Sequence, residues 1–215
     1  MESFFDSWVA RLDELRSDLL AALSRRPDSV PPAIDALLDH YREYCDAKAH
    51  LADTDVLRLL SHSWLTPFER TFLWVAGWKP SLVFRLVPQC NGGGGCPLSP
   101  DQRAAVEELE REVVAAEHRI SERMARAQEV MAGQAVLEAV RDGARNRVMR
   151  AAAADEVAQA LLAVVAAADE LRDATLRRMV EILAPAQTAE FLAAAAELRL
   201  RVRRWGLRRN AQQPA

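Results

Sequence analysis

Apolar residues recur at alternating steps of three and four along most of this chain, and that spacing constrains its fold more than any other feature. Because an α-helix has 3.6 residues per turn, such steps place the apolar side chains on one helix face. The longest stripe is close to a seven-residue repeat and consists of Val106, Leu109, Val113, Ala116, Ile120, Met124, Ala127 and Met131. The same spacing over residues 151–183 predicts a second long helix. The helix with the stripe from Val106 to Met131 could pair with another helix of the same chain or with a second chain, and we expect pairing within the chain.

Capping signals and prolines predict where the shorter helices begin and end. Thr66-Pro67-Phe68-Glu69 has the form of a capping box, and Gly77 is a suitable residue to end a helix, so we expect a helix over 67–76. Asp53 is the expected N-cap of a short helix before it. Two helices are expected at the N-terminus, and a last helix ends near Gly206. No segment alternates convincingly like a strand. The expected fold class is all-α, a multi-helix bundle with long antiparallel helices and no sheet.

Four consecutive glycines separate two helical blocks. Glycine loses much backbone entropy on ordering, so the stretch NGGGGC is expected to be a flexible connector. We therefore predict one helical domain over residues 1–210. It has an N-terminal block at 1–88, the connector at 89–98 and a C-terminal block at 99–206. Residues 207–215 are expected to form a flexible tail.

The composition argues against several classes of protein. A net charge of −3 does not favour general attraction to nucleic acid or acidic lipid. The longest apolar run covers residues 161–168, far short of the roughly 20 residues that span a bilayer. The N-terminus MESFFDSW lacks the basic and apolar regions of a signal peptide, and three unevenly spaced cysteines suit a reducing compartment. We expect a soluble intracellular protein.

Nearly half of the aromatic residues lie in one window, residues 61–88: Trp64, Phe68, Phe72, Trp74, Trp78 and Phe84. On the expected helix over 67–76, Phe68 and Phe72 share one face and Trp74 lies on another, as in a helix packed between others. Burial of each ring would contribute about 1.5–3 kcal/mol. We expect the rings to anchor the core. The alternative is that they line a groove for an apolar ligand or a partner helix.

Arginines crowd around Trp205 near the C-terminus: Arg199, Arg201, Arg203, Arg204, Arg208 and Arg209. Their guanidinium groups could pair with phosphate or with an acidic partner surface. The alternative is a solvated face whose arginine stems cover apolar neighbours. These residues, Trp205 included, are the candidate partner-binding residues. No zinc or helix-turn-helix signature occurs, so direct reading of a DNA sequence is not expected.

Catalytic and metal-binding patterns are not evident. Cys90 and Cys96 flank the glycines without a second cysteine pair, and His40, His50, His62 and His118 are scattered. The glycine stretch lacks the Lys-Ser/Thr ending of a phosphate-binding loop. We predict no enzyme activity, no metal and no cofactor.

Two blocks of this sequence resemble a known plant domain. YREYCDAKAHLADTDVLRLLSHSWLTPFERTFLWVAGWKPSLVFRLV is similar to the first half of the Delay of Germination domain, and its Trp-x-x-Pro-x-Glu-Arg-x-Phe-Leu-Trp motif is specific. ADELRDATLRRMVEILAPAQTAEFLAAAAELRLRVRRWGLRR resembles the second half. The same blocks occur in plant TGA-type bZIP transcription factors. The resemblance covers nearly the whole chain.

The resemblance implies a non-enzymatic regulatory protein that acts through protein–protein contacts. The family is linked to seed dormancy and maturation, to abscisic-acid responses and to transcription. Its members contact regulatory proteins that include type 2C protein phosphatases and transcription factors. The bZIP segment that reads DNA in the TGA-type relatives has no counterpart here, so we expect DNA association only through a bZIP partner.

Two departures from the family pattern stand out. The dormancy regulator is associated with haem and has a histidine pair where this chain has Arg199 and Arg203. Arginine does not ligate iron, so haem is not expected here. Ala184 replaces the Ser or Thr that usually precedes the proline at the start of the last helix, which costs about 1 kcal/mol of helix capping.

Overall fold

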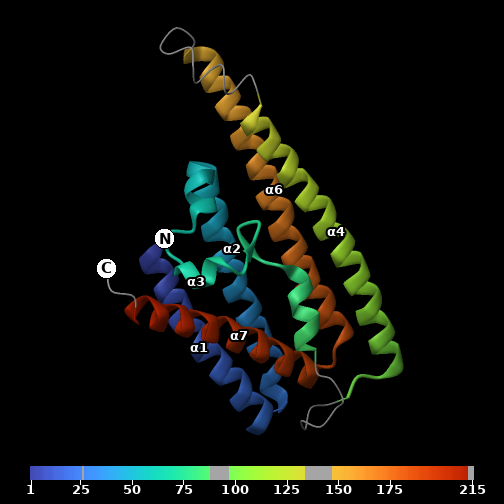
Figure 1. Ribbon diagram of the computed structural model, residues 1–215. Coiled ribbons are helices and arrows are strands. Elements are labelled where there is room, and N and C mark those ends of the chain that lie inside the picture. Colours follow the sequence, from blue (N-terminus) through green and yellow to red (C-terminus); the bar gives the residue numbers. More distant parts are fainter. Residues whose placement is uncertain (26, 88–96, 134–146, 213–215) are drawn as a thin grey trace.

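A computed structural model describes residues 1–25, 27–87, 97–133 and 147–212 (Figure 1). The N-terminal block contains helix α1 (Glu2–Arg25), a 3-10 turn η1 (Pro27–Ser29), helix α2 (Val30–Ser61) and helix α3 (Pro67–Arg70). Strands β1 (Leu73–Trp74) and β2 (Gly77–Trp78) and the 3-10 helix η2 (Pro80–Leu86) follow. The C-terminal block contains α4 (Pro100–Ala132), α6 (Arg147–Ile182) and α7 (Pro185–Gln212). The predicted all-α class is confirmed, with one very small sheet as the exception.

The two long helices α4 and α6 run side by side in opposite directions, and α7 crosses α1 on the other side of the molecule (Figure 1). The apolar stripe of α4 faces α6 of the same chain, where Leu109, Val113 and Ile120 are buried on α4 and Val164 and Ala168 on α6. The spacing of three and four residues therefore predicted this antiparallel pair correctly.

One main core connects the N-terminal and C-terminal blocks. This core buries Phe5 and Trp8 of α1, Phe191 of α7, and also Trp64 and Phe84. Trp8 is fixed further because its Nε1 donates to the His40 carbonyl oxygen at 2.8 Å. Two of the six rings of the aromatic window, Trp64 and Phe84, thus lie in this core.

The predictions of a helix over 67–76 and of no sheet are both wrong. Helix α3 begins at the predicted capping box but ends at Arg70, and the chain then forms a two-stranded antiparallel hairpin that pairs Leu73 with Trp78. Its turn residues Val75 and Ala76 have φ of 40° and 56°, where a two-residue hairpin turn needs positive values. A β-branched residue rarely adopts such angles, so contacts from elsewhere must hold this turn.

Two further boundaries differ from the expectation. Helix α2 runs through Asp53, and the break comes at Asp55, whose side chain accepts the Arg58 backbone N–H at 2.9 Å in place of the predicted cap. Helix α7 continues past Gly206 to Gln212, so residues 207–212 are helical and not part of a flexible tail. The predicted connector at 89–98 and the end of the predicted tail at 213–215 lie mostly or wholly outside the described residues.

Candidate partner-binding surface

The capping box of α3 connects three helices. The Thr66 hydroxyl and backbone N–H both donate to Glu69 Oε2, at 2.7 and 2.9 Å, and the Glu69 N–H donates to Thr66 Oγ1 at 3.2 Å. Arg203 of α7 donates to Glu69 Oε2 at 2.9 Å and to Asp6 of α1 at 2.8 Å. A single buried carboxylate therefore caps α3 and attaches it to α7.

Gly206 explains how closely α7 lies against this cap. A Cβ atom on Gly206 would be 2.1 Å from Thr66 Oγ1, which is far inside van der Waals contact. Glycine is required here for close approach, although it lowers helix propensity by about 1 kcal/mol. The Trp-Gly pair thus places Trp205 beside α3.

Aromatic rings from α3, the hairpin and α7 meet at the protein surface. The ring centroid of Phe68 lies 5.3 Å from that of Phe72 and 6.4 Å from that of Trp205, both edge to face. Phe72 stacks on Trp78 at 6.1 Å, and the Arg209 guanidinium lies 5.4 Å from the Phe68 ring. Trp205 is 48% exposed and Phe72 38% exposed.

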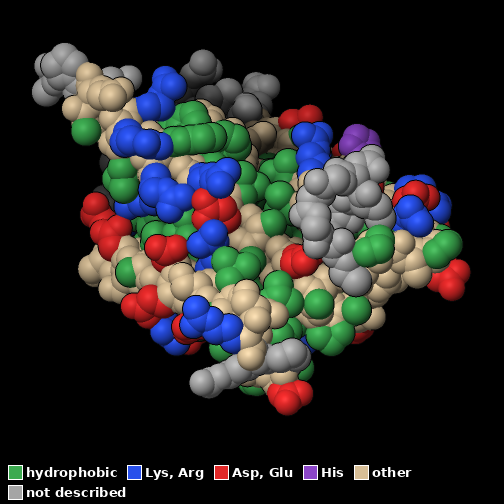
Figure 2. Space-filling model, turned by 90° about the horizontal axis from the view of Figure 1, so that it is seen from below, with side chains coloured by type: hydrophobic (Ala, Val, Ile, Leu, Met, Phe, Trp, Pro, Cys, Tyr) green, Lys and Arg blue, Asp and Glu red, His purple; other side chains and the backbone are tan. Residues whose placement is uncertain are grey.

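We call Phe68, Phe72, Trp78, Trp205, Arg208 and Arg209 the ring–arginine surface. In the space-filling view from below, Lys and Arg side chains gather around a stretch of hydrophobic side chains on the side where α7 ends (Figure 2). Large aromatic side chains and arginines are the residue types that contribute most to protein–protein binding. Phe72, Trp205 and the two arginines are exposed and Phe68 and Trp78 are half-buried, so together they have the composition of a binding surface.

A buried group of charges holds the hairpin that carries part of this surface. Arg172 of α6 donates to the carbonyl oxygens of Trp74, Val75 and Trp78, the last two at 2.8 Å, and to Asp169 at 2.7 Å. Lys48 of α2, only 1% exposed, donates to the Ala76 carbonyl at 3.2 Å and to Asp169 at 2.6 Å. These donors bind the strained turn and stabilise angles that Val75 and Ala76 would not adopt alone.

The arginine cluster near the C-terminus separates into inward and outward members. Arg199 lies among rings, with its guanidinium 4.9 Å from the Trp8 ring and 5.0 Å from the Tyr44 ring, and Arg203 is in the ion pairs described above. These two hold helices together. Neither offers a lone pair to iron, so these residues do not fit a haem ligand pair.

The outward arginines differ in their partners. Arg201 and Arg204 share the carboxylate of Glu197 with Arg16 of α1, and the hydrogen bond from Arg201 lowers the pKa of Glu197 below its ordinary value. Within the described parts of the chain, neither Arg208 nor Arg209 forms an ion pair. Arg199 also has no ion pair among the described residues, but its guanidinium group is covered by rings, so the exposed unmatched charge of the cluster is on Arg208 and Arg209.

The six rings of the aromatic window also separate. Trp64 and Phe84 lie in the core, and Trp74 is partly buried and donates from Nε1 to Ser121 Oγ at 2.9 Å. Phe72 is exposed, and the half-buried Phe68 and Trp78 contact it in the ring–arginine surface. The two sequence clusters meet through Phe68 and Trp205, which linear sequence alone does not indicate.

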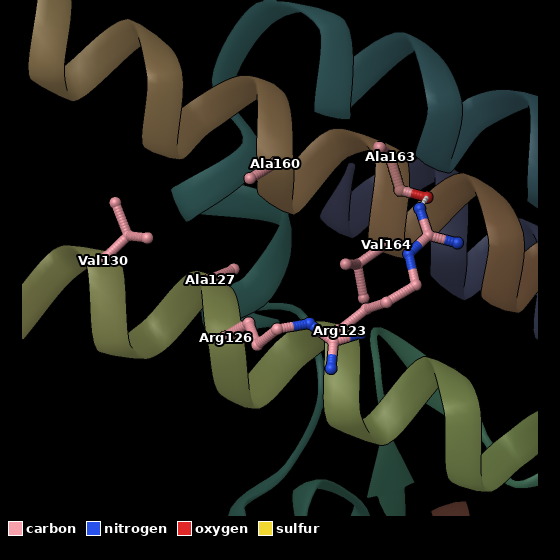
Figure 3. Close-up of a pocket in the computed structure, with 7 residues that line it drawn as sticks. All are labelled: Arg123, Arg126, Ala127, Val130, Ala160, Ala163 and Val164. Carbon is pink, nitrogen blue, oxygen red and sulfur yellow. Dashed lines mark hydrogen bonds between the residues drawn. The ribbon is translucent and has the colours of Figure 1, made fainter.

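An open pocket lies between α4 and α6 (Figure 3). Its lining consists of Arg123, Arg126, Ala127, Val130, Ala160, Ala163 and Val164, and Arg123 donates across it to the Ala163 carbonyl at 3.3 Å. None of the six rings lines it, so this pocket does not support the apolar-ligand alternative. In the described ranges, three or more potential metal-ligating side chains do not come together, and no helix is both long and apolar enough to cross a membrane.

Sequence reasoning missed Lys48, Asp169 and Arg172. One signal was present, because Lys48 follows Tyr44 by four residues and so falls on the inward stripe of α2. A lysine in an apolar stripe indicates a buried partner, since an unpaired buried charge is costly. Nothing in the sequence indicates that this partner lies on a helix more than a hundred residues away.

Comparisons with known proteins show which proteins this chain resembles in sequence. The family model DOG1, described as seed dormancy control, matches residues 11–89. Protein DOG1-like 4 of Arabidopsis thaliana is 35% identical over 96% of this chain and 92% of its own length. Transcription factor TGA7 of the same plant is 32% identical over 94% of this chain, which spans only 54% of TGA7. Transcription factor LG2 of Zea mays is 31% identical over 93% of this chain and 37% of its own length.

Proposed function

Because this chain belongs to the DOG1-like family, we propose that it is a plant regulatory protein that acts by binding other regulatory proteins and not by catalysis. Its similarity to TGA-type transcription factors connects it with the control of transcription. The proposed processes are seed dormancy and maturation and the abscisic-acid response. The proposed locations are the nucleus and cytoplasm.

The single observation that carries the proposal is the ring–arginine surface. Trp205 and Phe72 are large, substantially exposed and rigidly placed by neighbouring rings. A partner that covers them removes apolar surface from water at little entropic cost, because the rings are already ordered. Partners of two kinds are proposed, namely TGA-type transcription factors and type 2C protein phosphatases.

Calorimetry with purified proteins tests the proposal. The full chain is titrated with a TGA-type factor and with a type 2C phosphatase, using wild type and the double variant Phe72→Ala/Trp205→Ala. We expect at least one partner to bind, and the double variant to bind it at least about tenfold more weakly, as for a hot spot. Val114→Ala is the matched control, since Val114 is 47% exposed on α4. Equal binding by the double variant, or no binding of either partner, would refute the proposal.

A second candidate function is recruitment to DNA through a bZIP factor. The match to TGA7 over most of this chain favours it, since TGA7 is a transcription factor. In a gel-shift assay, the chain alone is expected to leave a DNA probe unshifted but to retard further a complex of that probe with a TGA-type factor. A shift by the chain alone that resists salt would contradict this reading.

A further inference from the structure

We propose that the ring–arginine surface binds an acidic protein segment that carries an apolar anchor residue. This inference rests on the proposed function and names the chemistry of the partner. The anchor packs beside Trp205 and Phe72, and flanking carboxylates pair with Arg208 and Arg209. The clustering of exposed rings with unmatched cations carries the inference, and neither feature alone would.

Charge complementarity identifies the polar part of the partner. Three neighbouring arginines of α7 already have carboxylate partners, because Glu197 pairs with Arg201 and Arg204, and Glu69 and Asp6 pair with Arg203. Arg208 and Arg209 form no such pair within the described residues, and both are exposed. An incoming carboxylate therefore meets guanidinium groups without displacing an internal partner, and arginine binds carboxylates in a bidentate geometry.

The rings identify the apolar part. Phe68 packs edge to face against both Phe72 and Trp205, so the exposed parts of those two rings flank a common centre. A leucine or phenylalanine side chain placed there would contact rings on two sides. Arg209 already lies over Phe68, which keeps its guanidinium group next to the rings. An anchor with acidic neighbours therefore contacts both features at once.

Single-stranded nucleic acid is the other class of molecule that combines stacked rings with arginines. Such a ligand needs a continuous basic track for its phosphates, and here the track is interrupted. Glu197 neutralises part of the charge of Arg201 and Arg204, and the whole chain has a net charge of −3. The charge distribution thus favours a short acidic protein segment over a phosphate backbone.

Fluorescence anisotropy with a labelled synthetic peptide tests the inference. The probe peptide has glutamates around a central Leu-Phe pair, and two matched peptides replace either the glutamates with glutamine or the Leu-Phe pair with alanine. We expect wild-type protein to bind the probe and to bind each matched peptide about tenfold more weakly. Arg208→Glu/Arg209→Glu should weaken probe binding about tenfold or more and remove most of its salt dependence. The control variant Arg119→Glu changes an exposed arginine of α4 and should have no effect.

Each outcome decides the question. Equal binding of the probe and the glutamine peptide overturns the acidic part, and equal binding of the alanine peptide overturns the apolar part. Binding of an oligothymidylate in place of the probe overturns the choice of a protein partner. If no peptide binds while Phe72→Ala/Trp205→Ala still weakens a purified protein partner, the proposed function stands and this inference fails. Circular dichroism melting of each variant shows whether it is folded, and Arg208→Gln/Arg209→Gln provides a milder second test of the same contacts.

Discussion

Replacing Arg172 with methionine removes the main support of the β1–β2 hairpin while keeping a long apolar side chain. Arg172 donates to three hairpin carbonyls and to Asp169, and its side chain is only 14% exposed. Without Arg172 those carbonyls lose this hydrogen-bond donor, and Lys48 is the remaining ion-pair partner of Asp169 among the described residues. A buried group left unsatisfied costs about 1–3 kcal/mol, and water entering from the partly open side recovers some of that. Removal of one partner of a buried ion pair costs about 3–5 kcal/mol, which we take as the expected total.

That loss is a large share of the 5–15 kcal/mol typical of a folded protein. It should be measured as the free energy of unfolding in urea, followed by tryptophan fluorescence and by circular dichroism together. Arg177→Met is the matched control, because Arg177 lies on the same helix but is exposed and pairs with Asp173. The control should change stability by less than about 0.5 kcal/mol. Arg172→Lys should fall between the two, since one ammonium group does not reach all the acceptors of the guanidinium.

A loss below about 1 kcal/mol for Arg172→Met would refute the reasoning. The turn angle of Val75 would then be stable without the donor to its carbonyl, contrary to the strain expected for such a residue. The variant should also weaken peptide binding, because the hairpin carries Trp78 and directly follows Phe72. Binding that is unchanged in a clearly destabilised variant would show that the hairpin does not position the surface.

Three further substitutions test other contacts. Gly206→Ala should destabilise the chain by about 1–3 kcal/mol, despite its better helix propensity, because its Cβ collides with Thr66; a gain in melting temperature would contradict this. Arg199→Ala should lower the free energy of unfolding by about 2–4 kcal/mol, because ring contacts are lost and a cavity is left behind. Guanidinium chloride at low millimolar concentration should restore part of that stability, compared with sodium chloride at the same concentration. Burial lowers the pKa of His62 below its ordinary 6.5, so the unfolded chain takes up a proton more readily and stability falls as pH drops below 6.5. His62→Asn, which suits the left-handed φ of 47°, should flatten that decline between pH 7.5 and 5; an unchanged slope would contradict the assignment.

Local patterns predicted those parts of the fold that depend on local physics. The stripe from Val106 to Ala127 sets which face of α4 meets α6, and the capping box sets where α3 begins. Both follow from residues within a few turns of each other. The end of α3 could not be read in the same way, because the segment after Arg70 is helix-compatible in sequence. Arg172 and Lys48 override that propensity with buried hydrogen bonds, and they come from α6 and α2.

The candidate surface was predicted in two halves but not as a whole. The aromatic window and the arginine cluster each stood out by composition, yet their meeting depends on Gly206 fitting against Thr66. Sequence also gave no means of separating Trp64, which is buried, from Phe72, which is exposed, because both lie in one apolar window. That separation depends on which helices cover the window, and those helices come from both ends of the chain.

The C-terminal helix shows how one short motif can serve both packing and recognition. Its period of 3.6 residues turns Arg199, Arg203 and Gly206 inward, toward rings, carboxylates and the capping box. The same period turns Arg204, Trp205 and Arg208 outward. A substitution of an inward residue therefore changes binding only through stability and the position of α7, whereas an outward one changes binding at constant stability. Measuring both partner binding and the free energy of unfolding for Arg203→Gln and Arg208→Gln should separate the packing role from the recognition role. Loss of binding without loss of stability in Arg203→Gln would show that the inward arginine also contacts the partner, and the division argued from helix geometry would be wrong.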